Sequence, residues 1–323
     1  MDDFEVIDAH VHMARNFSEE INWYLIPGRR DRDRWATPEG SIPWMDRSGI
    51  SKMVVLVLLP RTWRPSLSEK ARIEGLPTNE RQAAEKKMVS HLAPKIREFN
   101  EWGCKMGSMF PRLIPFILIA KDLGGAKDLA DEVALRFKQG AKGVKLHPGM
   151  HGFFPDDEAL WPMYARCQEL GLPVVADSGP WEVPNILVGS ASHLHQKHAD
   201  YGEPKNFEKV LKEFPHLTLV MAHLGSAWWD ERVELAEKYA NLRFDISQGF
   251  AAPDRIPFYP LRGLAEEDAP RILRKIGVER IMFGSDGPSL PFQLQLEQLL
   301  RLPLTDNEKR LILAENAKRI YHI

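Results

Sequence analysis

The chain has 323 residues, 44% of them hydrophobic, and its formal net charge is −2. This balance disfavours nucleic acid or an anionic membrane as a partner, and no apolar run is long enough to span a bilayer. The two cysteines, Cys104 and Cys167, are too few for a disulfide framework, and no signal peptide precedes the first predicted strand. We therefore expect a cytoplasmic protein that folds as one domain over residues 1–323.

A predicted strand at residues 4–12 opens the chain and carries Asp8, His10 and His12 near its end. Alternate residues of a strand share one face, so we expect these three side chains to point the same way. Two imidazoles placed in this way can hold one divalent metal ion, and Asp8 can orient one of the rings. A simple strand-end charge is the alternative for Asp8.

Further apolar runs of strand type alternate with helical patterns along the rest of the chain. The predicted strands are 52–59, 113–120, 143–147, 173–177, 217–223, 242–246 and 280–285. The last turns of one predicted helix lie at 43–49. The other predicted helices span 78–102, 124–139, 157–170, 204–214, 230–239, 268–276, 291–300 and 305–321. This alternation and the chain length predict an α/β fold, a distorted (β/α)8 TIM barrel with long insertions after strands 1, 2 and 5. An open doubly wound sheet is the alternative, although no glycine-rich fingerprint follows the first strand.

Polar residues end several of the predicted strands. They are His10, His12, Lys145, His147, Asp177, His223 and Asp286. In a barrel the carboxyl ends of the strands converge, so we expect these side chains to meet. His10, His12 and Asp286 can bind one divalent cation and leave a position open for water. His223 is the expected proton shuttle because imidazole titrates near neutral pH, and Asp286 can also accept a proton from the water.

A substrate can be bound by residues of the predicted fourth strand and of the loops above the barrel. Lys145 and His147 can both face the barrel interior, where they can hold an anionic substrate or add a metal ligand. A buried structural ion pair is the alternative for Lys145. The loops after the first two predicted strands are rich in arginine and tryptophan, which suit a small planar anion, and from them we select Arg61 and Trp63. The same loops can instead form a solvated surface or a homodimer contact.

Five segments together resemble the amidohydrolase superfamily, and specifically its amidohydrolase-related branch. This branch includes aminocarboxymuconate-semialdehyde decarboxylase and related metal-dependent hydrolases and decarboxylases. The matching segments are IDAHVH at 7–12, GVKLHP at 143–148, PVVADSG at 173–179, AHLG at 222–225 and FGSDGP at 283–288. The resemblance implies a distorted barrel whose divalent ion, usually zinc, is held by His10, His12 and Asp286, with His223 nearby.

One residue departs from the pattern of this branch. Asp177 stands where the fifth strand normally ends in a metal-binding histidine. We expect Asp177 to replace that histidine as a ligand, which makes the ligand set more anionic. Zinc is the first expectation for the single ion, and manganese or iron are the alternatives. A second ion bridged by a carboxylated Lys145, as in superfamily relatives, is a further alternative.

Three functions follow from these residues and from the resemblance. The first is a metal-dependent hydrolase that uses metal-activated water on an amide, ester or lactone of a small anionic or cyclic substrate. The second is a non-oxidative decarboxylase of an aromatic or unsaturated carboxylate. The third is a metal-poor relative that binds a ligand without turnover, which the departure at Asp177 supports.

Overall fold

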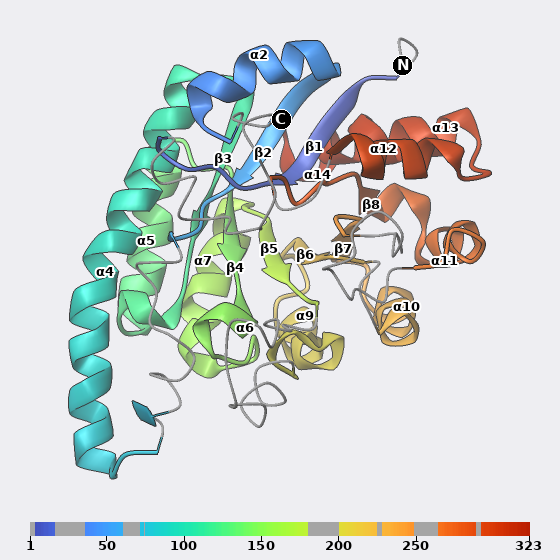
Figure 1. Ribbon diagram of the computed structural model, residues 1–323. Coiled ribbons are helices and arrows are strands. Elements are labelled where there is room, and N and C mark those ends of the chain that lie inside the picture. The colour runs from blue at the N-terminus through green and yellow to red at the C-terminus, as the bar shows by residue number, and fades with distance from the viewer. Residues whose placement is uncertain are drawn as a thin grey trace.

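Eight parallel strands follow one another in the order β1 to β8, as the sequence predicts (Figure 1). The computed structural model describes residues 4–16, 36–60, 72–73, 75–179, 200–224, 228–248, 264–288 and 292–323. The strands are β1 Val6–Val11, β2 Ile50–Leu56, β3 Leu113–Leu118, β4 Gly143–Leu146, β5 Val174–Asp177, β6 Leu219–Ala222, β7 Leu242–Asp245 and β8 Ile281–Met282. Residues 17–35, 61–71 and 180–199, which belong to the three predicted insertions, lie outside the described residues.

The two ends of the sheet meet where the chain beyond β8 lies against β1. The Ala9 N–H donates to the Phe283 carbonyl at 2.9 Å, and the Asp286 N–H donates to the His10 carbonyl at 2.8 Å. These bonds bring the first and last strands together and make the sheet a nearly closed barrel. The (β/α)8 prediction is therefore confirmed, and the open doubly wound sheet is wrong.

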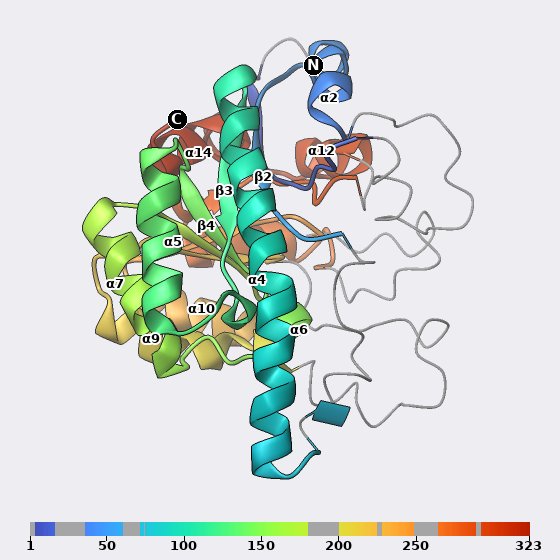
Figure 2. The ribbon, with the colours of Figure 1, turned by 90° about the vertical axis from the view of Figure 1, so that its left-hand side faces the viewer.

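The helices cover the outside of the strands, with α4, α5 and α7 side by side along one flank (Figure 2). The α-helices are α2 Pro38–Ser48, α4 Thr78–Met109, α5 Ala126–Lys138, α6 Pro148–His151, α7 Trp161–Leu170, α9 Glu208–Glu213, α10 Trp229–Lys238, α11 Ala269–Ile276, α12 Phe292–Arg301, α13 Asp306–Arg310 and α14 Asn316–Tyr321. Short 3-10 turns are η2 Lys121–Leu123, η3 Glu158–Leu160, η5 Asp200–Gly202, η6 Pro204–Phe207 and η7 Val278–Arg280, and a π-helical segment η8 spans Leu311–Glu315. None of the described helices is long and apolar enough to cross a membrane.

Local sequence sets several helix ends. The Thr37 side chain accepts a hydrogen bond from the Gly40 N–H at the start of α2, and Gly49 ends α2 in the left-handed region, with φ 70°. Helix α4 continues to Met109, beyond the predicted end at residue 102. Gly103 and Gly107 lie inside this helix and face the barrel. A Cβ at either position would come within 2.7 Å of a side chain of the barrel, so glycine is needed there for close packing and does not mark the helix end.

Strand β1 departs from strict alternation, which corrects one expectation. Between Asp8 and Val11 the chain of β1 advances by three residues, whereas its partner β2 advances only from Met53 to Val55. One extra residue therefore forms a bulge in β1 and reverses the alternation of its side chains. The expectation that Asp8 shares a face with the two histidines was wrong for this reason.

The barrel interior below the strand ends is apolar. Alternate strand residues such as Val54, Val175 and Val220 form a buried cluster with α14, separate from the cluster that packs between strands and helices. The ring of Tyr321 lies 4.9 Å from that of Phe116, so the end of α14 packs on this cluster.

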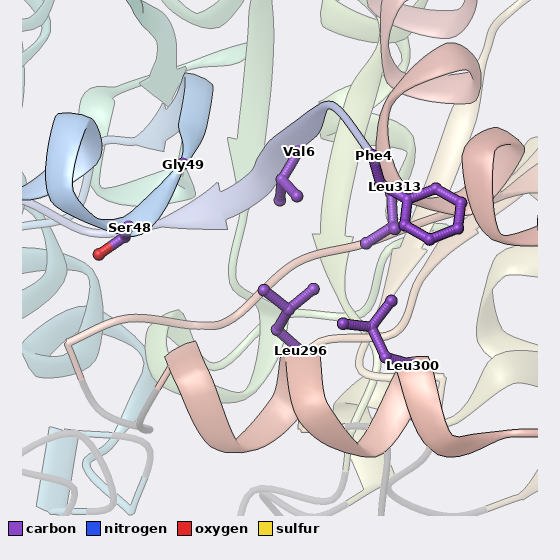
Figure 3. Close-up of a pocket in the computed structure, with 7 residues that line it drawn as sticks. All are labelled: Phe4, Val6, Ser48, Gly49, Leu296, Leu300 and Leu313. Carbon is purple, nitrogen blue, oxygen red and sulfur yellow. The ribbon is translucent and has the colours of Figure 1, made fainter. Parts of the chain in front are cut away.

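A small apolar pocket opens at the amino end of β1, between α2, α12 and η8 (Figure 3). Its lining residues are Phe4, Val6, Ser48, Gly49, Leu296, Leu300 and Leu313. The reactive side chains of a barrel lie at the carboxyl ends of its strands. The pocket is therefore separate from the candidate site, which begins at the other end of β1.

Candidate functional site

The structure gathers most of the predicted site residues at the carboxyl ends of the strands, where all of them are buried. The described ones are His10, His12, Lys145, His147, Asp177, His223 and Asp286. The other two predicted substrate-binding residues, Arg61 and Trp63, lie outside the described residues. Their contribution stays a prediction.

His10, His12 and Asp286 converge on one point. The Asp286 Oδ1 atom lies 3.1 Å from His12 Nε2 and 3.6 Å from His10 Nε2. One potential ligand atom from each residue lies within 4.8 Å of the others. Asp286 reaches this position with φ 54°, a left-handed conformation, and its backbone N–H donates to the His10 carbonyl. The barrel closure itself therefore brings these three residues together.

Each of the two histidines directs its Nε2 atom toward Asp286 because its Nδ1 atom is already engaged. His12 Nδ1 donates to the Leu56 carbonyl at 2.8 Å, and His10 Nδ1 donates to Asp245 Oδ2 at 2.9 Å. The lone pair of each ring is therefore on Nε2. His10 Nε2 is buried without a hydrogen-bond partner among the described residues.

The charge states of this group also suit a cation. Burial lowers the pKa of His10 to about 4, so its imidazole is neutral at physiological pH. Burial alone would raise the pKa of Asp286, but its contacts with the neighbouring imidazoles of His12 and His10 outweigh burial and lower that pKa. One imidazole nitrogen from each histidine and one carboxylate are a ligand set for a divalent transition metal with an open coordination position. These three residues fit the implied metal.

Asp245 is a functional residue that the sequence analysis missed. It ends β7 and accepts hydrogen bonds from the backbone of His223 at 3.2 Å and of Ser247 at 3.0 Å, in addition to the His10 ring. Burial works to raise its pKa, but the interaction with His10 dominates and lowers it to about 2. The sequence signal was present, because an acid ends an apolar strand here as at Asp177, but the predicted strand ran on to Ile246.

Asp8 does not contact an imidazole ring, because the bulge in β1 turns it away. Its carboxylate accepts hydrogen bonds from the Ser285 N–H at 2.9 Å, the Ser285 hydroxyl at 2.5 Å and the His10 N–H at 3.2 Å. Burial raises its pKa to about 7. Asp8 thus holds the turn that presents Asp286, whereas Asp245 orients the His10 ring.

A second group centres on Asp177 and lies beside the first. Asp177 Oδ2 is 2.9 Å from His223 Nε2 and 3.4 Å from His147 Nε2. Burial alone would raise the pKa of Asp177, but these two imidazoles lower it strongly. Among the described residues, Asp177 belongs to neither of the two groups of potential metal ligands, which are His10 with His12 and Asp286, and His10 with His223 and Asp245. Its role as a ligand stays a prediction.

The hydrogen bonds around Ser247 assign the protons of His223. The single hydroxyl proton of Ser247 is donated to Asp245 Oδ1 in a short contact. The contact of 2.9 Å between Ser247 Oγ and His223 Nδ1 therefore needs a proton on His223 Nδ1, while the Nε2 proton faces Asp177. These contacts favour the imidazolium form of His223. Consistently, the charge of Asp177 outweighs the effect of burial and raises the pKa of His223.

Lys145 lies fully buried on β4, and its Nζ atom has no hydrogen-bond partner within the described part of the chain. Burial lowers its pKa, while the charges of Asp177, Asp245 and Asp286 act in the opposite direction. The absence of an ion pair within 4 Å excludes a structural salt bridge between Lys145 and the described acids. Among the described residues, its amino group therefore lies near the acids of the site without a hydrogen-bond partner.

The sequence matches a known protein family over most of its length. A family model described as Amidohydrolase matches residues 91–323, which is more than half of the chain. The chain belongs to the amidohydrolase family. A search among curated proteins found no match.

Solved structures of similar fold cover almost the whole chain of this amidohydrolase family member. A dihydroxybenzoic acid decarboxylase from Polaromonas sp. JS666, with bound manganese and the inhibitor 2-nitroresorcinol, is 13% identical, with a TM-score of 0.69 and coverage of 99% of this chain and 97% of that one. The 5-carboxyvanillate decarboxylase from Sphingomonas paucimobilis is 12% identical, with a TM-score of 0.67 and 99% coverage of both chains. A probable 2-pyrone-4,6-dicarboxylic acid hydrolase from Acinetobacter baumannii, with citric acid bound, is 15% identical, with a TM-score of 0.58, and covers 99% of this chain and 100% of that one.

These comparisons correct the expected order of functions. Hydrolysis was the first expectation, but the similar structures are mostly decarboxylases of aromatic carboxylates, and the two decarboxylases above superpose better than the hydrolase. The expectation of a hydrolase was therefore wrong, and the second expectation is the one we carry forward. The expectation of an enzyme of the amidohydrolase superfamily is confirmed.

Proposed function

We propose that this protein is a metal-dependent, non-oxidative decarboxylase of a small aromatic carboxylate. The observation that carries the proposal is the placement of a proton-bearing imidazole, His223, next to a group of open metal ligands. The ring of His223 lies 4.9 Å from that of His10, whose Nε2 atom has no partner in the described residues. The similarity to decarboxylase structures, one of them with bound manganese, supports the same reaction.

His10, His12 and Asp286 are the residues that would hold the cation, and Asp177 is the proposed fourth ligand. When bound, a divalent cation would supply Lewis-acid polarisation of the substrate oxygens. Zinc and manganese are the candidates, and manganese gains support from the structural relative that contains it. The bound substrate would be small, because the side chains proposed to contact it, Lys145, His147 and His223, are themselves buried.

The reaction needs a proton at the carbon that loses carbon dioxide. The bond between the ring carbon and the carboxylate carbon breaks, its electron pair stays on the ring carbon, and that carbon takes up one proton while carbon dioxide leaves. His223 is the proposed donor because its contacts with Asp177 and Ser247 favour a proton on both of its nitrogens. Asp177 holds the imidazolium charge before the transfer, and Ser247 keeps the ring in its orientation.

Lys145 and His147 are the proposed anchors of the anionic substrate. The Lys145 amino group has no hydrogen-bond partner in the part of the chain that the structure describes, so an anionic oxygen of the substrate can supply one. His147 Nδ1 accepts the Met150 N–H at 3.3 Å, which leaves the proton on Nε2, on the side of Asp177. Arg61 and Trp63 are proposed as further contacts from the loop after β2.

The proposal is tested by incubating the manganese-loaded and zinc-loaded protein with hydroxylated benzoates and measuring carbon dioxide release. We expect release with wild-type protein and a loss of kcat of about 10²- to 10⁴-fold in His223→Gln, with unchanged metal content. Removal of an exposed histidine, in His216→Gln, should change neither quantity. Hydrolysis of lactones without carbon dioxide release would contradict the proposal. A protein that cannot be loaded with any divalent ion would instead fit a non-catalytic binding role.

A further inference from the structure

Arg232 is a buried cation that the proposed reaction does not use. It lies on α10 with no exposed surface, and it is the largest fully buried side chain among the described residues. No acidic side chain in the described residues lies within ion-pair distance of its guanidinium, and its Nε and Nη1 atoms have no hydrogen-bond partner there. A buried charge without a salt bridge is costly, so packing alone does not account for it.

The one nitrogen of Arg232 with partners reaches the end of β5. Arg232 Nη2 donates to the Ser178 carbonyl at 2.5 Å and lies 3.3 Å from the Ser178 hydroxyl. Ser178 directly follows Asp177, the last residue of β5. The guanidinium therefore contacts the residue next to the carboxylate that pairs with His223.

Ser178 in turn connects the ends of β5 and β6. Its hydroxyl donates to the Ala222 carbonyl at 2.6 Å, and Ala222 directly precedes His223. The backbone of His223 has φ 64°, in the left-handed region, so its position depends on contacts that hold the strand end. Hydrogen bonds through Ser178 thus connect Arg232 to the ends of β5 and β6, where Asp177 and His223 lie.

We propose that Arg232 is a positioning residue that holds Asp177 against His223 through Ser178. The positive charge of Arg232 also attracts the carboxylates of Asp177 and Asp245 across the buried strand ends, which favours the same position of Asp177. The inference rests on the proposed function only for its kinetic consequence. The contact between Asp177 and His223 is present in the structure without any assumption about the reaction.

The first measurement is spectroscopic and uses the metal-free full chain. The proton on His223 Nε2, donated to Asp177, should give a downfield imidazole resonance that is assigned by its loss in His223→Gln. We expect Arg232→Met to shift or broaden this resonance, because the Ser178 carbonyl loses its donor. Arg232→Lys, which keeps the charge and one donor, should restore it in part.

The second measurement is kinetic. We expect kcat for decarboxylation to fall roughly 10- to 100-fold in Arg232→Met with KM changed by less than about twofold, because partners that orient catalytic groups carry effects of this size. Arg136→Met is the matched control. Arg136 is also buried in a helix, but it bonds Glu132 and the Arg97 carbonyl, remote from the strand ends of the site. The control should lower stability without changing the His223 resonance or kcat.

If Arg232→Met does not fold, Ser178→Ala tests the positioning role, because this smaller change removes the hydrogen bond from Ser178 to the Ala222 carbonyl. A wild-type His223 resonance in the folded member of this pair overturns the proposal, whatever the activity. A changed resonance in a protein that releases no carbon dioxide from any substrate keeps the proposal and contradicts the proposed function instead. A wild-type resonance with a reduced kcat assigns Arg232 another role and overturns the positioning role.

Discussion

At the level of single side chains, each imidazole of the site is oriented by the partner of its other nitrogen. His12 is fixed by the Leu56 carbonyl and His10 by Asp245, and both therefore present Nε2. His223 is fixed at both nitrogens, by Asp177 and by Ser247, and these contacts favour a proton on each. In the proposed function the same residue type would thus serve as a neutral ligand at His10 and as a cationic acid at His223, because the acids and carbonyls around each ring set its protonation.

Asp177 provides the first prediction at this scale. If it is the fourth ligand, Asp177→Ala should weaken metal binding at least about tenfold, in the same direction as His10→Ala. Metal content after dialysis against a chelator-buffered solution measures the effect. Asp122→Ala is the control, because Asp122 is a buried acid paired with a histidine, His151, outside both potential ligand groups. Unchanged metal binding in Asp177→Ala would leave Asp177 as the partner of His223 only.

At the level of elements, the site depends on how closely β1 approaches the chain beyond β8. Gly284 makes this approach possible, because a Cβ there would lie 2.8 Å from the Cβ of His10 and 3.4 Å from the Cβ of Ser247. Real Cβ atoms do not come so close, and here backbone-anchored atoms would have to move. A close approach at this position therefore places His10 next to the residues of β7.

Gly284→Ala should consequently push β1 away from β8. We expect a loss of stability of about 1–3 kcal/mol, as for other crowded cores, together with weaker metal binding. Urea denaturation and metal titration measure the two effects. Gly103→Ala is the matched control, because its Cβ would lie 2.7 Å from a Val57 methyl on the helix side of the barrel. Loss of stability without any change in metal binding in Gly284→Ala would show that His10 does not depend on this contact.

A second element-scale prediction concerns the start of α13. Glu308 accepts hydrogen bonds from Arg274 at 2.7 Å and from the Thr305 N–H, and these contacts lower its pKa to about 2 from an ordinary 4.5. A lowered pKa stabilises the fold above pH 4.5, and this contribution disappears as the pH falls toward 2.

We expect Glu308→Gln to lower stability at neutral pH by ~1 kcal/mol or less, because the pair is near the surface. The difference from wild type should vanish in acid, which thermal melts across this pH range would detect. Glu85→Gln, at an exposed pair with Arg81 at 3.9 Å, should show no such difference. A difference that persists at low pH would contradict the assignment to ionised Glu308.

At the level of the whole molecule, the candidate ligands come from opposite ends of the chain. His10 and His12 belong to β1, whereas Asp286 follows β8, and the closure of the barrel brings them within ligand distance. A bound cation would therefore join the first and last strands. Any ligand that binds only the folded state stabilises it, by about 4 kcal/mol at a thousandfold excess over its Kd.

Addition of manganese or zinc to the metal-free protein should accordingly raise Tm by several degrees. The His10→Ala/His12→Ala double variant should fold but lose most of this rise. Calorimetry with and without metal measures both. An equal rise in the double variant would place the cation elsewhere on the protein.

Much of the fold could be predicted from the sequence because the strands are short, apolar and separated by helical patterns. The alternation is local, and it needs no knowledge of partners. The strand ends carrying His10, Asp177, His223 and Asp286 were found in the same way, since a polar side chain that follows a buried strand stands out. Asp245 was missed because Ile246 prolongs the apolar run past the true end of β7.

The sequence by itself determined the order of the elements and the kinds of side chain at the barrel mouth. Only the tertiary structure decided which partners orient each histidine ring, that Asp8 holds the Asp286 turn, and that Arg232 contacts Ser178. The physical reason is that these outcomes depend on a bulge in β1, on positive φ at His223 and Asp286, and on contacts between residues far apart in the chain. No local pattern encodes such contacts, because they exist only once the barrel has closed.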